Sequence, residues 1–62
     1  MNKLQLHDIF VHYEEGYKPM FFLVLDVTDV GVDALNLITQ YMARETDHCL
    51  GENECLISRT SK

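Results

Sequence analysis

The stretch that decides the fold is Pro19-Met20-Phe21-Phe22-Leu23-Val24-Leu25-Asp26-Val27, which is apolar at nearly every position. In an extended strand, successive side chains point to opposite faces of the sheet. Two apolar sets result, one of Phe21, Leu23, Leu25 and Val27, and one of Met20, Phe22 and Val24. Both faces of this predicted strand therefore need an apolar partner.

The residues before this strand predict another strand and a turn. Ile9, Val11 and Tyr13 alternate with other residues, as in a half-buried strand. Leu4 and Leu6 alternate in the opposite phase, so either a bulge near His7-Asp8 or a separate short N-terminal segment precedes this strand. Gly16 offers positive φ for the turn, and Pro19 stands where a strand can begin. The two strands should form an antiparallel hairpin.

A helix is expected after residue 27. Apolar residues recur at helical spacing at Ala34, Leu35, Ile38, Tyr41 and Met42. Thr28 or Asp29 is a suitable N-cap, and the helix is expected to end near residues 45–47. Residues 55–59 then predict a short final strand.

These elements predict one α+β domain over residues 1–62. It has a three-stranded, mainly antiparallel sheet with one helix packed on one face, in the order β-β-α-β. One helix covers only one face of a small sheet, so either the set formed by Met20, Phe22 and Val24 or its alternate set stays uncovered, and we expect the former. An uncovered apolar set usually marks a contact with another protein.

Composition narrows the classes of function. Ten acidic and five basic residues give a net charge of −5, which disfavours direct binding to nucleic acid or to an anionic membrane. The longest apolar run, Met20 to Leu25, is too short to span a bilayer. The N-terminus lacks the apolar core of a signal peptide, so a cytoplasmic location is expected.

No residue pattern predicts catalysis or a bound cofactor, so we expect neither an enzyme nor a metal protein. Cys49 and Cys55, with His48, are too few and too widely spaced for a typical zinc site. The two thiols would lie opposite one another if Gly51 to Asn53 formed a tight hairpin, which leaves a disulfide open. In a reducing compartment we expect free thiols.

The acidic residues suggest a rim around an apolar centre, which is a common layout of protein interfaces. The residues expected to contact a partner are Tyr13, Glu14, Glu15, Tyr17, Met20, Phe22 and Val24.

In size, acidity and expected element order, the chain resembles the small phage-encoded inhibitors of host proteins. From Leu23 to Ile57 it is similar in outline to the T7-type inhibitor of bacterial RNA polymerase, in which a strand leads through a Thr/Asp turn into a helix with an Ala-Leu pair, here Ala34-Leu35. The final strand has only Arg59 where that inhibitor is richer in arginine. The resemblance implies a protein that binds and inhibits a larger host enzyme or defence complex, with no binding residue carried over.

Two further hypotheses stand beside this one. The chain could form a homodimer through its open face, as a regulatory or antitoxin-like protein does. It could also be a metal- or redox-responsive module that uses Cys49 and Cys55.

Overall fold

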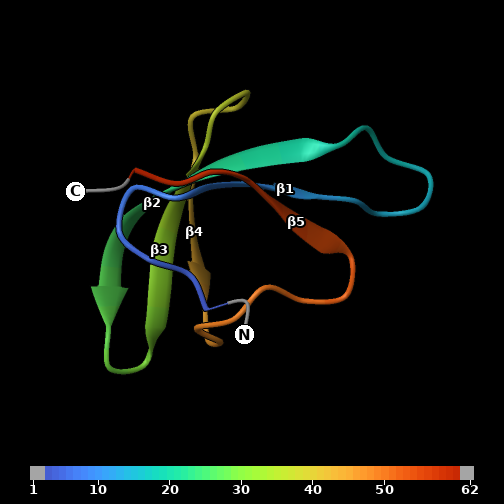
Figure 1. The fold of residues 1–62 in the computed structure, drawn as a ribbon. Coiled ribbons are helices and arrows are strands. Elements are labelled where there is room, and N and C mark those ends of the chain that lie inside the picture. The colour runs from blue at the N-terminus through green and yellow to red at the C-terminus, as the bar shows by residue number, and fades with distance from the viewer. Residues whose placement is uncertain (1–2, 61–62) are drawn as a thin grey trace.

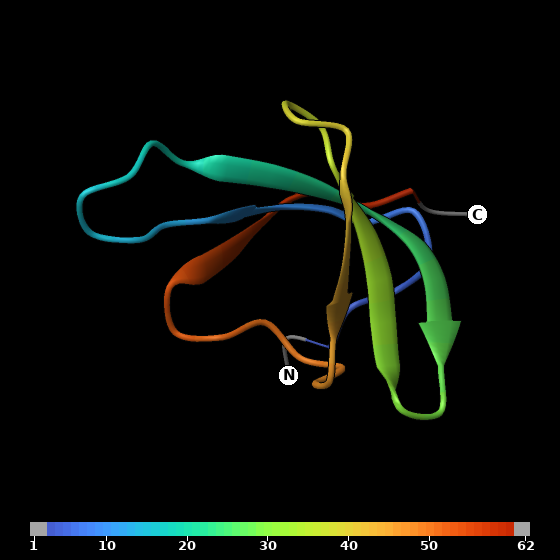
Figure 2. The same ribbon diagram turned by 180° about the vertical axis from the view of Figure 1, so that it is seen from behind.

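The computed structural model describes residues 3–60, which form one five-stranded antiparallel sheet. Its strands are β1 (Ile9–His12), β2 (Met20–Thr28), β3 (Gly31–Asn36), β4 (Met42–Glu45) and β5 (Glu54–Ser58). The first four strands form a meander, and the chain then returns to pair β5 with the free side of β1. The spatial order is therefore β4-β3-β2-β1-β5 (Figures 1 and 2).

Three predicted elements are confirmed. β1 and β2 form the expected antiparallel hairpin, and Gly16 lies in their connection with a φ of 87°. β2 begins at Met20 as predicted, and β5 begins at Glu54, one residue earlier than predicted. Both alternatives for the N-terminus have a counterpart in the structure. His7 has a φ of 71°, and Val24 accepts from the His7 N–H at 2.9 Å and donates to the Asp8 carbonyl at 2.8 Å, so His7 and Asp8 together oppose one residue, as in a bulge. Leu4 lies outside β1, and Lys3 forms an isolated β-bridge with Cys49.

The predicted helix is wrong, and with it the α+β class and the three-stranded sheet. Residues 31–36 and 42–45 are strands, and the described chain contains no helix. Burial along β3 alternates with a period of two, because Val32, Ala34 and Asn36 are buried and the residues between them are only half-buried. This strand period competes with the helical spacing of the apolar residues, and strand pairing on both sides of β3 decides between them.

Two polar side chains build the turns that replace the helix. Thr28, predicted as an N-cap, instead accepts a hydrogen bond from the Val30 N–H and donates one to the Gly31 carbonyl. Asn36 Oδ1 accepts from the N–H groups of Ile38 and Thr39 at 2.9 and 3.0 Å, which folds the chain back after β3. Thr28, a predicted capping residue, thus does bond to nearby backbone groups, but the turn that it closes joins two strands and does not begin a helix.

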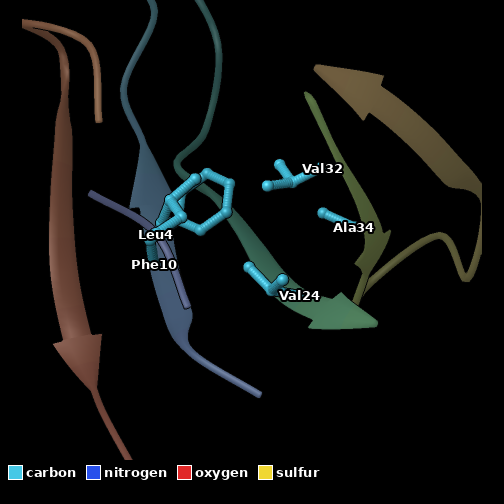
Figure 3. Packing of buried hydrophobic residues seen from close by; sticks show 5 residues of the cluster. All are labelled: Leu4, Phe10, Val24, Val32 and Ala34. Atoms are coloured by element: carbon cyan, nitrogen blue, oxygen red, sulfur yellow. The ribbon is translucent and has the colours of Figure 1, made fainter. Parts of the chain in front are cut away.

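The sheet bends strongly around a small core. A register irregularity between Val24 and Asp26 interrupts the β2–β3 ladder, and such bulges bend a strand. Figure 1 shows β3 and β4 running across the direction of β1. The bend brings together a cluster of buried side chains that point toward one another in Figure 3: Leu4, Phe10, Val24, Val32 and Ala34.

This core predicts which aliphatic truncation is costly. Val32 is fully buried, so Val32→Ala should lower the free energy of unfolding by about 2 kcal/mol. Ile38 belongs to the face of the predicted helix but is 71% exposed in the turn after β3. Ile38→Ala should therefore change stability by less than about 0.5 kcal/mol. Urea denaturation of both variants checks the pair, and an equal loss in each would contradict this core.

Candidate protein-binding face

The side of the sheet that faces away from the core carries a continuous apolar row. Residues directly opposite one another on paired strands project to the same side. Leu35 pairs with Met42 on β4 and with Leu23 on β2, and Leu23 pairs in turn with Ile9 on β1. One apolar row therefore crosses four strands.

A second row lies beside the first. Val11 pairs with Phe21 on β2 and with Cys55 on β5. Val11 and Phe21 are two positions from Ile9 and Leu23 on their strands, so they project to the same side, and Cys55 shares that side because it lies opposite Val11. We call the two rows together the outer apolar face, which consists of Ile9, Val11, Phe21, Leu23, Leu35, Met42 and Cys55. None of its members carries a formal charge at neutral pH.

The outer apolar face is open at its margins and tightly packed at its centre. Val11 is only 1% exposed, whereas Phe21 is 36% and Met42 is 56% exposed. The turn after β3 adjoins Phe21, because the Leu37 N–H donates to the Phe21 carbonyl at 2.8 Å. That turn also carries exposed Ile38 and Tyr41, so apolar surface extends from the sheet onto the turn.

Charged residues border this face on β2, β3 and β4. Asp33 pairs with Asp26 on one side and with Arg44 on the other, next to the apolar row. The Arg44 guanidinium donates to both Asp33 oxygens at 2.8 and 3.5 Å. The hydrogen bond to Asp33 is the main cause that raises the pKa of Arg44, and Asp26 adds to it. An apolar centre thus meets a charged rim with an excess of carboxylates.

The remaining surface is also acidic. Both arginines of the chain are engaged in ion pairs, Arg44 with Asp33 and Arg59 with Asp8. Lys3 and Lys18 are the exposed basic residues left among residues 3–60. Opposing them, outside the ion pairs of the described chain, are the exposed carboxylates of Glu15, Asp26, Asp29, Glu45, Asp47 and Glu52. A basic partner is therefore favoured electrostatically.

The apolar set predicted to be uncovered is the wrong one of the two. Val24 is fully buried in the core, and Phe22 packs against that core with its ring 5.3 Å from the Phe10 ring. Met20 is half-buried on the same side, across from His12. The alternate set, represented by Phe21 and Leu23, projects outward instead.

The other residues expected to bind a partner lie in the connection between β1 and β2. Tyr13 and Tyr17 are 49% and 72% exposed, and Glu14 and Glu15 are exposed beside them. Figures 1 and 2 show this connection projecting from one end of the molecule. These four residues were predicted to form one binding site with Phe22 and Val24, but in the structure they lie in an exposed connection whereas Phe22 and Val24 belong to the core side of β2.

A buried ion pair joins the two ends of the described chain. The Asp8 carboxylate has no solvent exposure and accepts two hydrogen bonds from the Arg59 guanidinium, at 3.0 and 2.8 Å. Arg59 also donates to the Lys3 carbonyl, and the Gln5 N–H donates to Asp8. The hydrogen bond from Arg59 is the main cause that lowers the pKa of Asp8. No feature of the sequence alone pairs residues 51 positions apart.

The two cysteines lie in different parts of the fold. Cys49 forms an isolated β-bridge with Lys3 through its backbone, and Cys55 pairs with Val11 on β1. The two cysteines therefore do not face one another across a hairpin. Both are exposed free thiols. Within residues 3–60, no group of three or more metal-ligating side chains is placed to hold a metal ion, and no pocket is present. Nor does that part of the chain contain a helix long and apolar enough to cross a membrane.

Comparison of the chain with protein-family models, with curated proteins and with solved structures gave no match. The functional argument therefore rests on the geometry of the outer apolar face and its charges.

Proposed function

We propose that this chain is a small acidic protein-binding module that docks through its outer apolar face onto a larger protein. The observation that carries the proposal is the uncharged double row that crosses the sheet, with the tightly packed Val11 between the exposed Phe21 and Cys55. Interfaces commonly combine such an apolar centre with a charged rim. Phe21 and Met42 are the natural anchors, because they are large, apolar and accessible.

The charge of the module indicates the chemistry of its partner. Its exposed carboxylates favour a protein whose docking site is apolar in the middle and basic at the edge. Surfaces that handle nucleic acid are basic, so a polymerase, nuclease or defence complex in the cytoplasm fits the charge of the module, and binding there would inhibit it. The helix on which the likeness to phage inhibitors rested is absent from residues 3–60, and the proposal stands on the face instead.

The second candidate function is a regulatory homodimer. β5 is an edge strand whose only charged residue is Glu54, at its first position; Cys55, Leu56, Ile57 and Ser58 carry no formal charge. Edge strands without charges or proline are prone to pair with another strand. β4, the opposite edge, carries Arg44 and Glu45. The net charge of −5 opposes self-association, and for this reason we favour the basic partner.

The test replaces Phe21 by Asp and compares it with Val30→Asp. Val30 is 61% exposed in the turn between β2 and β3 and is outside the outer apolar face, so it is a matched control. A partner is first identified by photo-crosslinking from position 21 and purified. Phe21→Asp should then weaken binding by 30-fold or more, about 2 kcal/mol at an anchor residue, whereas Val30→Asp should leave it nearly unchanged.

Two further measurements complete this test. Binding of the wild-type module should weaken with added salt, as expected for charged rims. Circular dichroism should show the same sheet in both variants. Equal binding by Phe21→Asp and Val30→Asp would overturn the proposal. Crosslinks between two copies, with light scattering at twice the monomer mass, would also overturn it and establish the homodimer.

A further inference from the structure

A histidine between two carboxylates holds the base of the connection between β1 and β2. His12 Nδ1 lies 2.9 Å from Glu54 Oε2, and His12 Nε2 lies 3.4 Å from Glu14 Oε1. The imidazole thus joins the end of β1 to the start of β5 and to residues 13–19, which we call the arm. The charged groups that act on the ring are these two carboxylates, and β2 places the uncharged Met20 across from it.

The two carboxylates are held unequally. Glu54 has a side chain that is only 13% exposed, and its second oxygen, Oε1, accepts the Gly51 N–H at 2.8 Å. Glu14 has a side chain that is 57% exposed, and its contact with the ring is the longer one. When the imidazole can keep only one of its two carboxylate contacts, we therefore expect it to keep Glu54 and to lose Glu14.

Protonation decides how many carboxylates the ring can hold. A charged imidazolium donates from both nitrogens, whereas a neutral imidazole has a single N–H. In the neutral state, one nitrogen would present a lone pair to a carboxylate oxygen, which is repulsive. Of the arm residues, Tyr13 would stay linked to the 51–53 turn by its N–H bond to the Asn53 carbonyl.

We propose that His12 is a pH-operated latch, which fixes the arm through Glu14 when the ring is protonated and releases it when the ring is neutral. This inference is independent of the function proposed for the outer apolar face. The hydrogen bond to Glu54 is the main cause that raises the pKa of His12, and the bond to Glu14 adds to it. Because the folded pKa is raised, the stabilisation is complete below the ordinary value of 6.5 and disappears as the pH rises through the folded pKa.

The test measures the mobility of the arm on both sides of the transition. Backbone ¹⁵N order parameters of residues 14–18 should fall from about 0.8 at pH 6 to about 0.6 or below at pH 8.5. The midpoint should agree with the ring titration of His12, followed by NMR in the same sample. In His12→Gln, the order of the arm should no longer depend on pH over this range.

Two variants serve as controls. Glu14→Ala removes an exposed side chain together with its acceptor oxygens, so it should fold normally, but its arm should be mobile at both pH values. His7→Gln removes an exposed histidine elsewhere and should keep the pH response of the wild type. An arm of unchanged mobility in the wild type between pH 6 and 8.5, or an unchanged response in Glu14→Ala, would overturn the latch.

Discussion

Replacement of Arg59 by Met should remove most of the stability of the fold at neutral pH. The substitution keeps an apolar stem but removes the cation from the Asp8 carboxylate, which has no solvent exposure. Breaking one side of a buried ion pair costs about 3–5 kcal/mol, and we expect the lower end because the partner of Asp8 lies near the surface. The whole stability of a domain this small is about 3–5 kcal/mol. Thermal melting by circular dichroism checks this directly.

The pH dependence of the Arg59→Met protein should have the opposite sign to that of the wild type. In the wild type, Arg59 lowers the pKa of Asp8 below 3.8, so the pair stabilises the fold above this pH and ceases to do so in stronger acid. Without the cation, burial raises the pKa of Asp8, so stability should increase as the pH falls and Asp8 becomes protonated. Addition of Asp8→Asn should likewise rescue the variant. If Arg59→Met alone were as stable as the wild type, the ion pair would not contribute to stability.

Gly31→Ala should be the second strongly destabilising change. The Gly31 φ of 152° belongs to a region that side chains rarely adopt, and a Cβ there would lie 1.8 Å from the Glu45 carbonyl oxygen. The Glu45 oxygen is a backbone atom and the position of a Cβ is fixed by the backbone of residue 31, so β4 would have to move away from β3 to relieve the clash. We expect a loss of about 3 kcal/mol or more, combining backbone strain with disrupted strand pairing.

Gly16→Ala is the matched control for this prediction. Gly16 also has positive φ, at 87°, but nothing lies within 4 Å of a Cβ built there. Its cost should be limited to the conformational strain, about 1 kcal/mol. Urea denaturation of the two alanine variants separates strain from steric conflict, and equal losses would show that the close approach to Glu45 does not matter.

The sequence predicted the strands that carry strong local signals. β2 is a long run of apolar residues bounded by Pro19, and its hairpin with β1 follows from the glycine at position 16. These features act between near neighbours, so a reading of one sequence can find them. The same holds for β5, a short apolar segment that follows a turn.

The helix was predicted in error because two periods are present in the same residues. Ala34, Leu35, Ile38 and Met42 have helical spacing, while Val32 and Ala34 also fit a strand. Only the partners of β3 resolve the conflict, since it pairs with β2 on one side and β4 on the other. Such tertiary context regularly overrides local propensity.

The assignment of the two faces of β2 failed for a related reason. With a helix as the only cover, either face could be the open one. The bent sheet instead closes on itself, and Leu4 from the N-terminal segment completes the core around Val24. That leaves Phe21 and Leu23 outside. Phe21 and Leu23 belong to the strand that the sequence predicts best. Which side of that strand they occupy relative to the core, however, depends on the fold as a whole.

The ion pair between Asp8 and Arg59, together with the pairing of β1 and β5, has a consequence for protein synthesis. The residues joined by this ion pair are 51 positions apart, so β1, which pairs early with β2, gains its second partner β5 only after the other strands have been made. β2, β3 and β4 can form their hairpins earlier, because they pair with sequence neighbours. The ion pair between Asp8 and Arg59 can close only after residue 59 has left the ribosome. A nascent chain stalled before that point should remain sensitive to proteases, and the finished chain should become resistant.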